Sequence, residues 1–134
     1  MKSDCYIPEA QIRELERAGN KIVTNLNKGQ TQILLKAARK VQKRIKEKAP
    51  LGPTGNLKKS TYAKALPPTV TQRAVAFAGV RARKAPHAHL VEYGHGGPHP
   101  APPHPFIRPA WDSIKDEIQR DISCDFKNNV EGSV

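Results

Sequence analysis

Residues 87–111 read HAHLVEYGHGGPHPAPPHPFIRPAW, and this stretch decides how the rest of the chain is organised. The segment 87–93 predicts a short helix that ends at Gly94, after which a loop rich in glycine, proline and histidine leads into another helix. Proline fixes φ and has no N–H, so the loop over 94–105 can form neither a central strand nor a helix interior. Its free carbonyl groups suit pairing with another surface. We therefore expect a protruding loop that serves assembly rather than catalysis.

The segment after the loop predicts a C-terminal helix over 110–122. Its apolar residues recur at helical spacing and predict a buried stripe made of Trp111, Ile114, Ile118 and Ile122. Phe106 and Trp111 are expected to anchor the start of this helix. The alternative is that they are interface side chains buried in a neighbouring subunit, and the same two roles are open for Tyr93.

Two helices are expected in the N-terminal part of the chain. The first runs from about Pro8 to Leu26, with an apolar seam made of Ile12, Leu15, Gly19, Ile22, Val23 and Leu26. The residues Asn27-Lys28-Gly29 favour a break. A second, basic helix then ends at Pro50, and its apolar stripe consists of Leu34, Ala38, Val41 and Ile45.

Turns and strands are expected between these helices and the loop. Residues 51–55 have turn composition, and Thr54 is a candidate cap for a short helical segment from Leu57 to Ala63. Residues 70–83 are rich in small and β-branched side chains and predict one or two antiparallel strands with an edge available.

The expected fold class is therefore α+β. The N-terminal helices and a C-terminal helix pack on a small antiparallel β-sheet, and a long Pro/His/Gly-rich loop protrudes. A length of 134 residues suits one domain over 1–134, with residues 1–8 and 124–134 frayed. No apolar run approaches the roughly 20 residues that span a bilayer, and no signal-peptide core is present, so no membrane association is expected. Cys5 and Cys124 are expected to be reduced thiols in a reducing cytoplasm.

The formal net charge is +11, and most of the excess lies in the N-terminal half. The expected basic face comprises Lys36, Arg39, Lys40, Lys43, Arg44 and Lys46. One interpretation is a solvated helix face that complements an acidic neighbouring protein. The other is direct contact with nucleic acid phosphates. Because no aromatic residue is interleaved with these cations, the face does not predict a stacking platform for single strands.

Five histidines lie close together in the sequence: His87, His89, His95, His99 and His104. They could ligate zinc, but the first two are two residues apart and the others lie on the loop, unlike the usual zinc-ligand spacing. Polar loop residues that make interface hydrogen bonds are the favoured interpretation, and neither a metal nor a cofactor is expected. An interface lined by histidine would depend on pH near about 6 to 7.

Catalytic interpretations of the sequence are weaker. Glu92 could act as a general base beside His89 or His95, but it more plainly suits a helix cap or a salt bridge to Arg108. The sequence has no nucleophile elbow, no phosphate-binding glycine-rich loop and no second carboxylate near Glu92. We therefore expect the protein not to be an enzyme.

Two phrases of the sequence resemble one protein family. Val91-Glu92-Tyr93-Gly94 is followed, after the loop, by PFIRPA over 105–110, and Ala49-Pro50 is followed by TGNLKKS over 54–60. This order is similar to the tail-component or tail-completion family of long-tailed bacteriophages, the lambda-like head-tail joining or neck proteins. The resemblance covers roughly residues 9 to 122.

The resemblance implies a structural virion protein that completes the tail and joins it to the head. It implies a homo-oligomeric ring, most often a hexamer, that contacts a head-side connector or stopper protein and a tail tube or tail terminator protein. Genomic DNA would pass through the lumen without sequence-specific contacts, and assembly would occur in the host cytoplasm. The candidate interface residues are Glu92, Tyr93, His95, His99, His104, Phe106, Arg108 and Trp111. The alternatives are a tail terminator or other minor tail protein and, from another class, a small basic DNA-binding protein.

Overall fold

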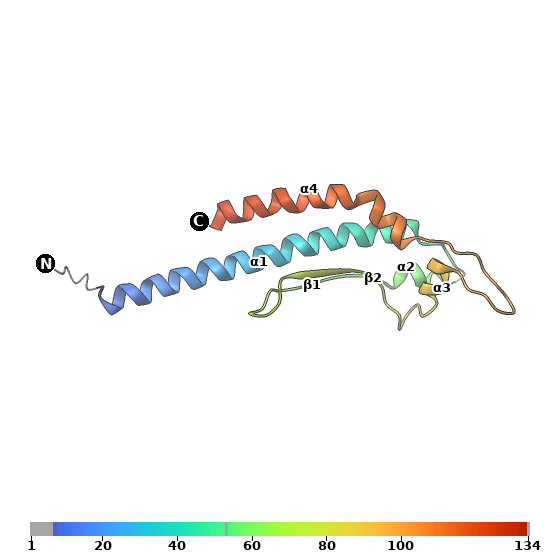
Figure 1. Ribbon diagram of the computed structural model, residues 1–134, viewed down its shortest axis with the longest axis horizontal. Helices are drawn as coiled ribbons and strands as arrows, with labels where there is room; N and C mark the ends of the chain where they lie inside the picture. The colour runs from blue at the N-terminus through green and yellow to red at the C-terminus, as the bar shows by residue number, and fades with distance from the viewer. Residues whose placement is uncertain (1–6, 53, 134) are drawn as a thin grey trace.

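Helix α1 (Glu9–Lys48) is the central element of the computed structural model, which describes residues 7–52 and 54–133. Helix α4 (Ile107–Ser133) lies along one side of α1, and a hairpin of β1 (Thr61–Leu66) and β2 (Val75–Val80) lies along another (Figure 1). The short helices α2 (Asn56–Lys59) and α3 (Ala88–Tyr93) and the loop over 94–105 gather at the C-terminal end of α1. The α+β class is therefore confirmed.

The N-terminal part forms one helix, so the expected break at Asn27-Lys28-Gly29 was wrong. Glycine in a helix interior costs about 1 kcal/mol relative to alanine, but tertiary packing overrides this preference. Here α4 approaches so closely that a Cβ at Gly29 would collide with the side chain of Asn129. The Asn129 amide also donates to the carbonyl oxygen of Leu26 over 3.5 Å. The glycine that favoured a break thus provides the space for a helix contact.

The sheet is antiparallel, as expected, but its first strand was missed. Thr61 pairs with Val80 and Leu66 with Val75, which places β1 where the sequence predicted the end of a helix. The helical segment is limited to α2, and Gly55, with φ of 62°, occupies its N-cap position without any side-chain hydrogen bond. The expected cap at Thr54 was therefore wrong.

The main core lies at the C-terminal end of α1, where all four helices and the hairpin converge. It contains Ile45, Ala49, Leu57, Ala85, Phe106 and Ala110, with Val80 and Val91 packed against it. The Phe106 side chain is 0% exposed, which confirms its expected role as an anchor of the last helix. A second cluster of Ala37, Ile114 and Ile118 joins α1 to α4 farther along.

Helix α4 is longer at both ends than the expected 110–122. It continues past Cys124, so the expected fraying of the C-terminal residues was wrong over the described range. The extra turns are held by Asp125, which pairs with Lys36, and by Asn129. Cys124 is an exposed free thiol, whereas Cys5 and most of the expected frayed N-terminus lie outside the described residues. No helix within the described ranges is long and apolar enough to cross a membrane.

Candidate assembly surfaces

Glu92, at the end of α3, fixes the start of α4. Its side chain is buried, and its carboxylate accepts hydrogen bonds from the backbone N–H groups of Phe106, Ile107 and Arg108 at 2.8, 3.0 and 3.1 Å. The first N–H groups of a helix have no partner within the helix, and a carboxylate there also interacts favourably with the helix dipole. Of the roles expected for Glu92, the cap is confirmed.

The cap also sets the ionisation of Glu92. Burial by itself would raise the pKa of this carboxyl group, but the hydrogen bonds from Ile107, Phe106 and Arg108, together with the positive charge of Arg108, hold its pKa below the ordinary value. Glu92 is therefore ionised at neutral pH, as a cap requires. No Glu92–Arg108 ion pair occurs in the part of the chain that the structure describes.

The loop over 94–105 leaves this cap and returns to it. The His104 N–H donates to the Val91 carbonyl oxygen over 2.8 Å, and His95 and Ala101 exchange two backbone hydrogen bonds of 3.0 and 3.1 Å. Gly94 has φ of 73°, and a Cβ there would lie 2.8 Å from the Ala101 carbonyl oxygen. The base of the loop is thus fixed, while the tip between His95 and Ala101 projects beyond the end of the molecule (Figure 1). The expected protruding loop is confirmed.

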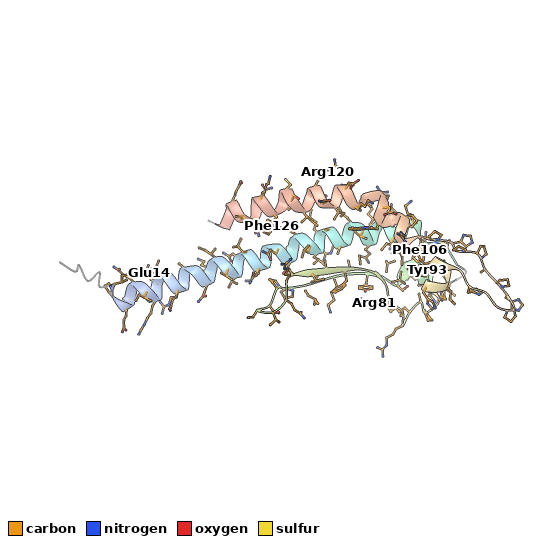
Figure 2. The ribbon with its side chains drawn as sticks, viewed as in Figure 1. Glu14, Arg81, Tyr93, Phe106, Arg120 and Phe126 are labelled. Atoms are coloured by element: carbon orange, nitrogen blue, oxygen red, sulfur yellow. The ribbon has the colours of Figure 1, made fainter. Side chains whose placement is uncertain are left out.

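Several candidate interface residues surround one hollow beside the loop. Its volume is about 450 Å³, and its lining includes Glu92, Tyr93, Arg108 and Trp111. The Tyr93 side chain is 80% exposed and Trp111 45% exposed, so the expected burial of Trp111 on the α4 stripe was wrong. Phe106, by contrast, lies in the core of this end of the molecule (Figure 2) and cannot contact a partner without unfolding.

The histidines remain dispersed on the surface. All five side chains are exposed, and the Nδ1 atom of His95 lies 3.2 Å from the carbonyl oxygen of Gly96. Among the described residues, no group of three or more His, Cys, Asp or Glu is positioned to hold a metal ion. The arrangement instead presents His95, His99 and His104 as separate donors or acceptors along the loop.

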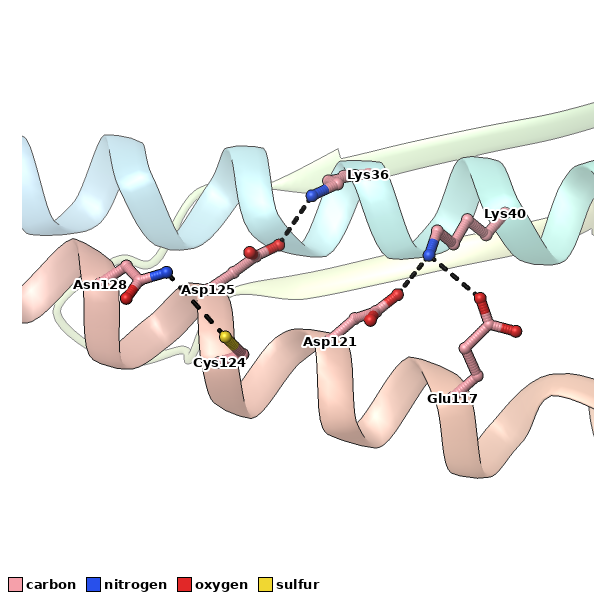
Figure 3. Close-up of polar contacts among 7 residues, drawn as sticks. All are labelled: Lys36, Lys40, Glu117, Asp121, Cys124, Asp125 and Asn128. Atoms are coloured by element: carbon pink, nitrogen blue, oxygen red, sulfur yellow. Dashed lines mark hydrogen bonds and ion pairs between the residues drawn. The ribbon is translucent and has the colours of Figure 1, made fainter.

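The expected basic face is divided by α4. Figure 3 shows Lys36 paired with Asp125 over 3.0 Å, and Lys40 paired with Glu117 over 3.3 Å and with Asp121. The hydrogen bond from Lys40 lowers the pKa of Asp121, and the bonds to Asp121 and Glu117 raise the pKa of Lys40. The acidic neighbour of this face is therefore, in part, the chain's own last helix.

The rest of the basic face is open to solvent. Arg44 pairs with Glu47 of the same helix over 3.4 Å. Arg39, Lys43 and Lys46 are exposed and take part in no ion pair within residues 7–52 and 54–133. The division could have been anticipated from the acids of the last helix, since Glu117, Asp121 and Asp125 recur every four residues and so share a face.

One surface was not recognised in the sequence. Apart from Leu26, the predicted apolar seam of the first helix is not covered by the chain, because α1 extends beyond the ends of α4 and of the hairpin (Figure 1). Ile12, Leu15, Ile22 and Val23 are all exposed. The sequence indicated the apolar seam, but it did not indicate that most of the seam is exposed in the monomer.

Exposed surfaces thus lie at both ends of the described structure, on the loop over 94–105 at one end and on the start of α1 at the other. The family described as "Bacteriophage HK97-gp10, putative tail-component" matches residues 13–94, well over half of the chain. The chain belongs to this HK97-gp10-like family of bacteriophage tail components and is thus a virion protein. No curated protein and no solved structure matches it.

Proposed function

We propose that this protein completes the phage tail and joins it to the head connector as a ring, most simply a hexamer, through which the genomic DNA passes. It acts as a structural protein and not as an enzyme, without cofactor or metal. Its partners are copies of itself, a head-side connector or stopper protein, and the tail tube or tail terminator protein. The observation that supports this function best is the loop over 94–105, which is fixed at its base and exposed at its tip.

Such a loop suits docking between rings. Its prolines limit the conformations of the unbound state, so less entropy is lost when a partner orders it. The carbonyl groups and imidazoles at its tip can pair with a neighbouring protein. Both strands of the two-stranded sheet also have an outer edge that is unpaired within the described residues, which gives a second place for backbone pairing.

The charge distribution supports one placement of the basic face relative to the proposed DNA path. Lysine or arginine side chains lining a lumen would hold phosphates, whereas packaged DNA must slide. Lys36 and Lys40 pair with carboxylates of α4, so these two cations are less available to phosphates. The exposed Arg39, Lys43 and Lys46 are therefore assigned to the outside of the ring or to contacts between rings.

Co-sedimentation with purified tails and with connector-bearing heads tests this function. Replacement of the loop histidines by His95→Ala and His99→Ala is expected to weaken binding to one of the two particles. The control carries His87→Ala, an exposed histidine that lies outside the loop and outside the lining of the hollow beside it. Binding by the control but not by the loop variant supports the docking role, and binding to tails alone would favour the tail terminator.

The rival function is DNA binding through Arg39, Lys43 and Lys46. A protein that neutralises several phosphates loses affinity steeply as salt is added. Steep salt dependence of duplex DNA binding, combined with no binding to tails or heads, would overturn the neck function and favour a small basic DNA-binding protein.

A further inference from the structure

The part of α1 that extends beyond α4 is an amphipathic helix with no cover. We call residues 9–25 the α1 overhang; Glu14 marks it in Figure 2. All of its residues are exposed, including Leu15 at 68% and Val23 at 54%. Apolar side chains arranged in one stripe on an exposed helix mark a surface that another element covers.

A groove of matching chemistry runs along the covered half of α1. Its floor is α1 itself and one wall is α4. The other wall is the hairpin, which contributes β2 to one part of the groove and the turn over 68–74 to the other. Two adjoining hollows of about 350 and 470 Å³ share Leu34 and Ile122 and together form this groove. Small side chains of the floor and of β2 leave space in it, including those of Ala38, Ala76 and Ala78.

We propose that the α1 overhang of one copy docks into the α1–α4–β2 groove of a neighbouring copy. The overhang and the groove floor are parts of the same continuous helix, so a chain cannot place its overhang in its own groove. The occupant must therefore belong to another molecule. This inference deepens the proposed ring, on which it rests, by naming the two surfaces that join its subunits.

The apolar stripe on the overhang continues the face of α1 that contacts α4 within the same chain. Leu15, Gly19, Ile22, Leu26, Gly29 and Ile33 follow one another at alternating steps of four and three residues. This spacing keeps them on one face of a helix. Leu26 and Gly29 meet Asn129 of α4, and Ile33 lines the groove. The same face therefore packs against α4 within the chain and, farther along, is presented to a second copy.

The length of the overhang agrees with this partner. At a rise of about 1.5 Å per residue, the overhang is about 25 Å long, and the α4 wall from Trp111 to Phe126 is about 22 Å long.

The two surfaces also satisfy the symmetry of a ring. Overhang and groove are different patches, so the contact is heterologous, and each docked copy offers one unused overhang and one unused groove. Repetition of such a contact closes a ring when the rotation between copies is a simple fraction of a full turn.

Disulfide crosslinking between two differently labelled chains tests the contact. Both chains first carry Cys5→Ser and Cys124→Ser. One then carries Gly19→Cys at the middle of the overhang, where a Cβ meets nothing within 4 Å, and the other carries Ala76→Cys at the middle of the groove. Central positions report docking in either direction of the helix. The matched control replaces Gly19→Cys with Lys21→Cys, on the opposite face of the overhang.

The crosslink is measured in the free protein at high concentration and on purified tails. We expect a heterodisulfide between the Gly19→Cys and Ala76→Cys chains, at least about tenfold more abundant than with the Lys21→Cys control. A chain carrying both cysteines is expected to give a ladder of linked oligomers. Absence of the link in both settings, or equal linking by the control, overturns the docking contact.

The outcomes separate this contact from the proposed function. Protein that joins tails without the crosslink retains the neck function and overturns only the docking contact. A crosslink in free protein that binds neither tails nor heads supports the contact and overturns the neck function. Ile22→Asp, an exposed substitution that leaves the monomer folded, is expected to abolish both the link and the oligomer.

Discussion

The two halves of α1 carry similar amphipathic patterns but have different surroundings. From Leu26 to Lys48, the apolar residues meet α4 and the hairpin, and Ile45 is 1% exposed. Over 9–25 the equivalent residues are exposed, Leu15 at 68%. Hydrophobic periodicity therefore specifies which face of a helix is covered, but it does not specify whether the cover comes from the same chain or from another one.

The largest expected difference between the halves comes from core truncation. Ile45→Ala should lower the free energy of unfolding by about 2–5 kcal/mol, because it removes buried methyl groups and leaves a cavity. Ile22→Ala, the same substitution in the overhang, should change it by less than about 0.5 kcal/mol in the monomer. Urea unfolding, at a protein concentration where light scattering gives the monomer mass, measures both. Equal losses would show that the overhang is packed within the monomer.

A second comparison is between the buried carboxylate of Glu92, near the covered end of α1, and exposed carboxylates of the same chain. Glu92→Gln should destabilise the protein by about 2 kcal/mol, since the amide caps three N–H groups of α4 less well than a carboxylate. Because folding lowers the pKa of Glu92, its stabilisation is complete above the unfolded pKa of about 4.3 and is lost as pH falls through the folded value.

Unfolding measured over a range of pH checks this sign. The difference between the wild-type protein and Glu92→Gln should be constant near neutral pH and shrink in acid. Glu131→Gln, an exposed glutamate of α4, is the matched control and should show almost no difference at any pH. A Glu92→Gln difference that grows as the pH falls would contradict the cap.

The two glycines of α1 allow a third comparison, because Gly19 lies in the exposed half of the helix and Gly29 in the covered half. Gly19→Ala should stabilise the monomer by about 0.5–1 kcal/mol, because alanine is the better helix former and a Cβ there meets nothing within 4 Å. At Gly29 the same change must displace Asn129, so it should stabilise less than Gly19→Ala or destabilise. Thermal unfolding of the two variants measures the difference, and equal shifts would show that α4 does not approach α1 closely at Gly29.

Much of this fold followed from the sequence because its signals are local. The loop boundaries, the short helix before Gly94, the cap role of Glu92 and the stripe through Ile114 and Ile118 all depend on residues near one another in the chain. Each such signal has a direct physical cause, such as the missing proline N–H or the positive φ of Gly94.

The errors arose where distant segments decide the structure. Gly29 was read as a break, but its partner Asn129 lies about a hundred residues away. Strand β1 was missed because its sequence, TYAKAL, alternates weakly and gains its stability by pairing with β2. The basic face was assigned as a unit, although the acids that neutralise part of it lie on α4. A single sequence indicates each face but not which faces meet.

The smallest expected effect tests that division of the basic face. Lys40→Gln removes the partner of Glu117 and Asp121, whereas Lys43→Gln removes an exposed cation of the same helix. Lys40→Gln should lower the unfolding midpoint slightly more than Lys43→Gln does, and the difference should vanish near 1 M salt, where the Debye length is about 3 Å.

For weak duplex DNA binding the order of the two variants should be reversed, because Lys40 already has carboxylate partners and Lys43 has its charge available to phosphates. Filter binding at low salt measures that order, and a larger loss of DNA binding from Lys40→Gln would mean that phosphates compete successfully with α4 for this face.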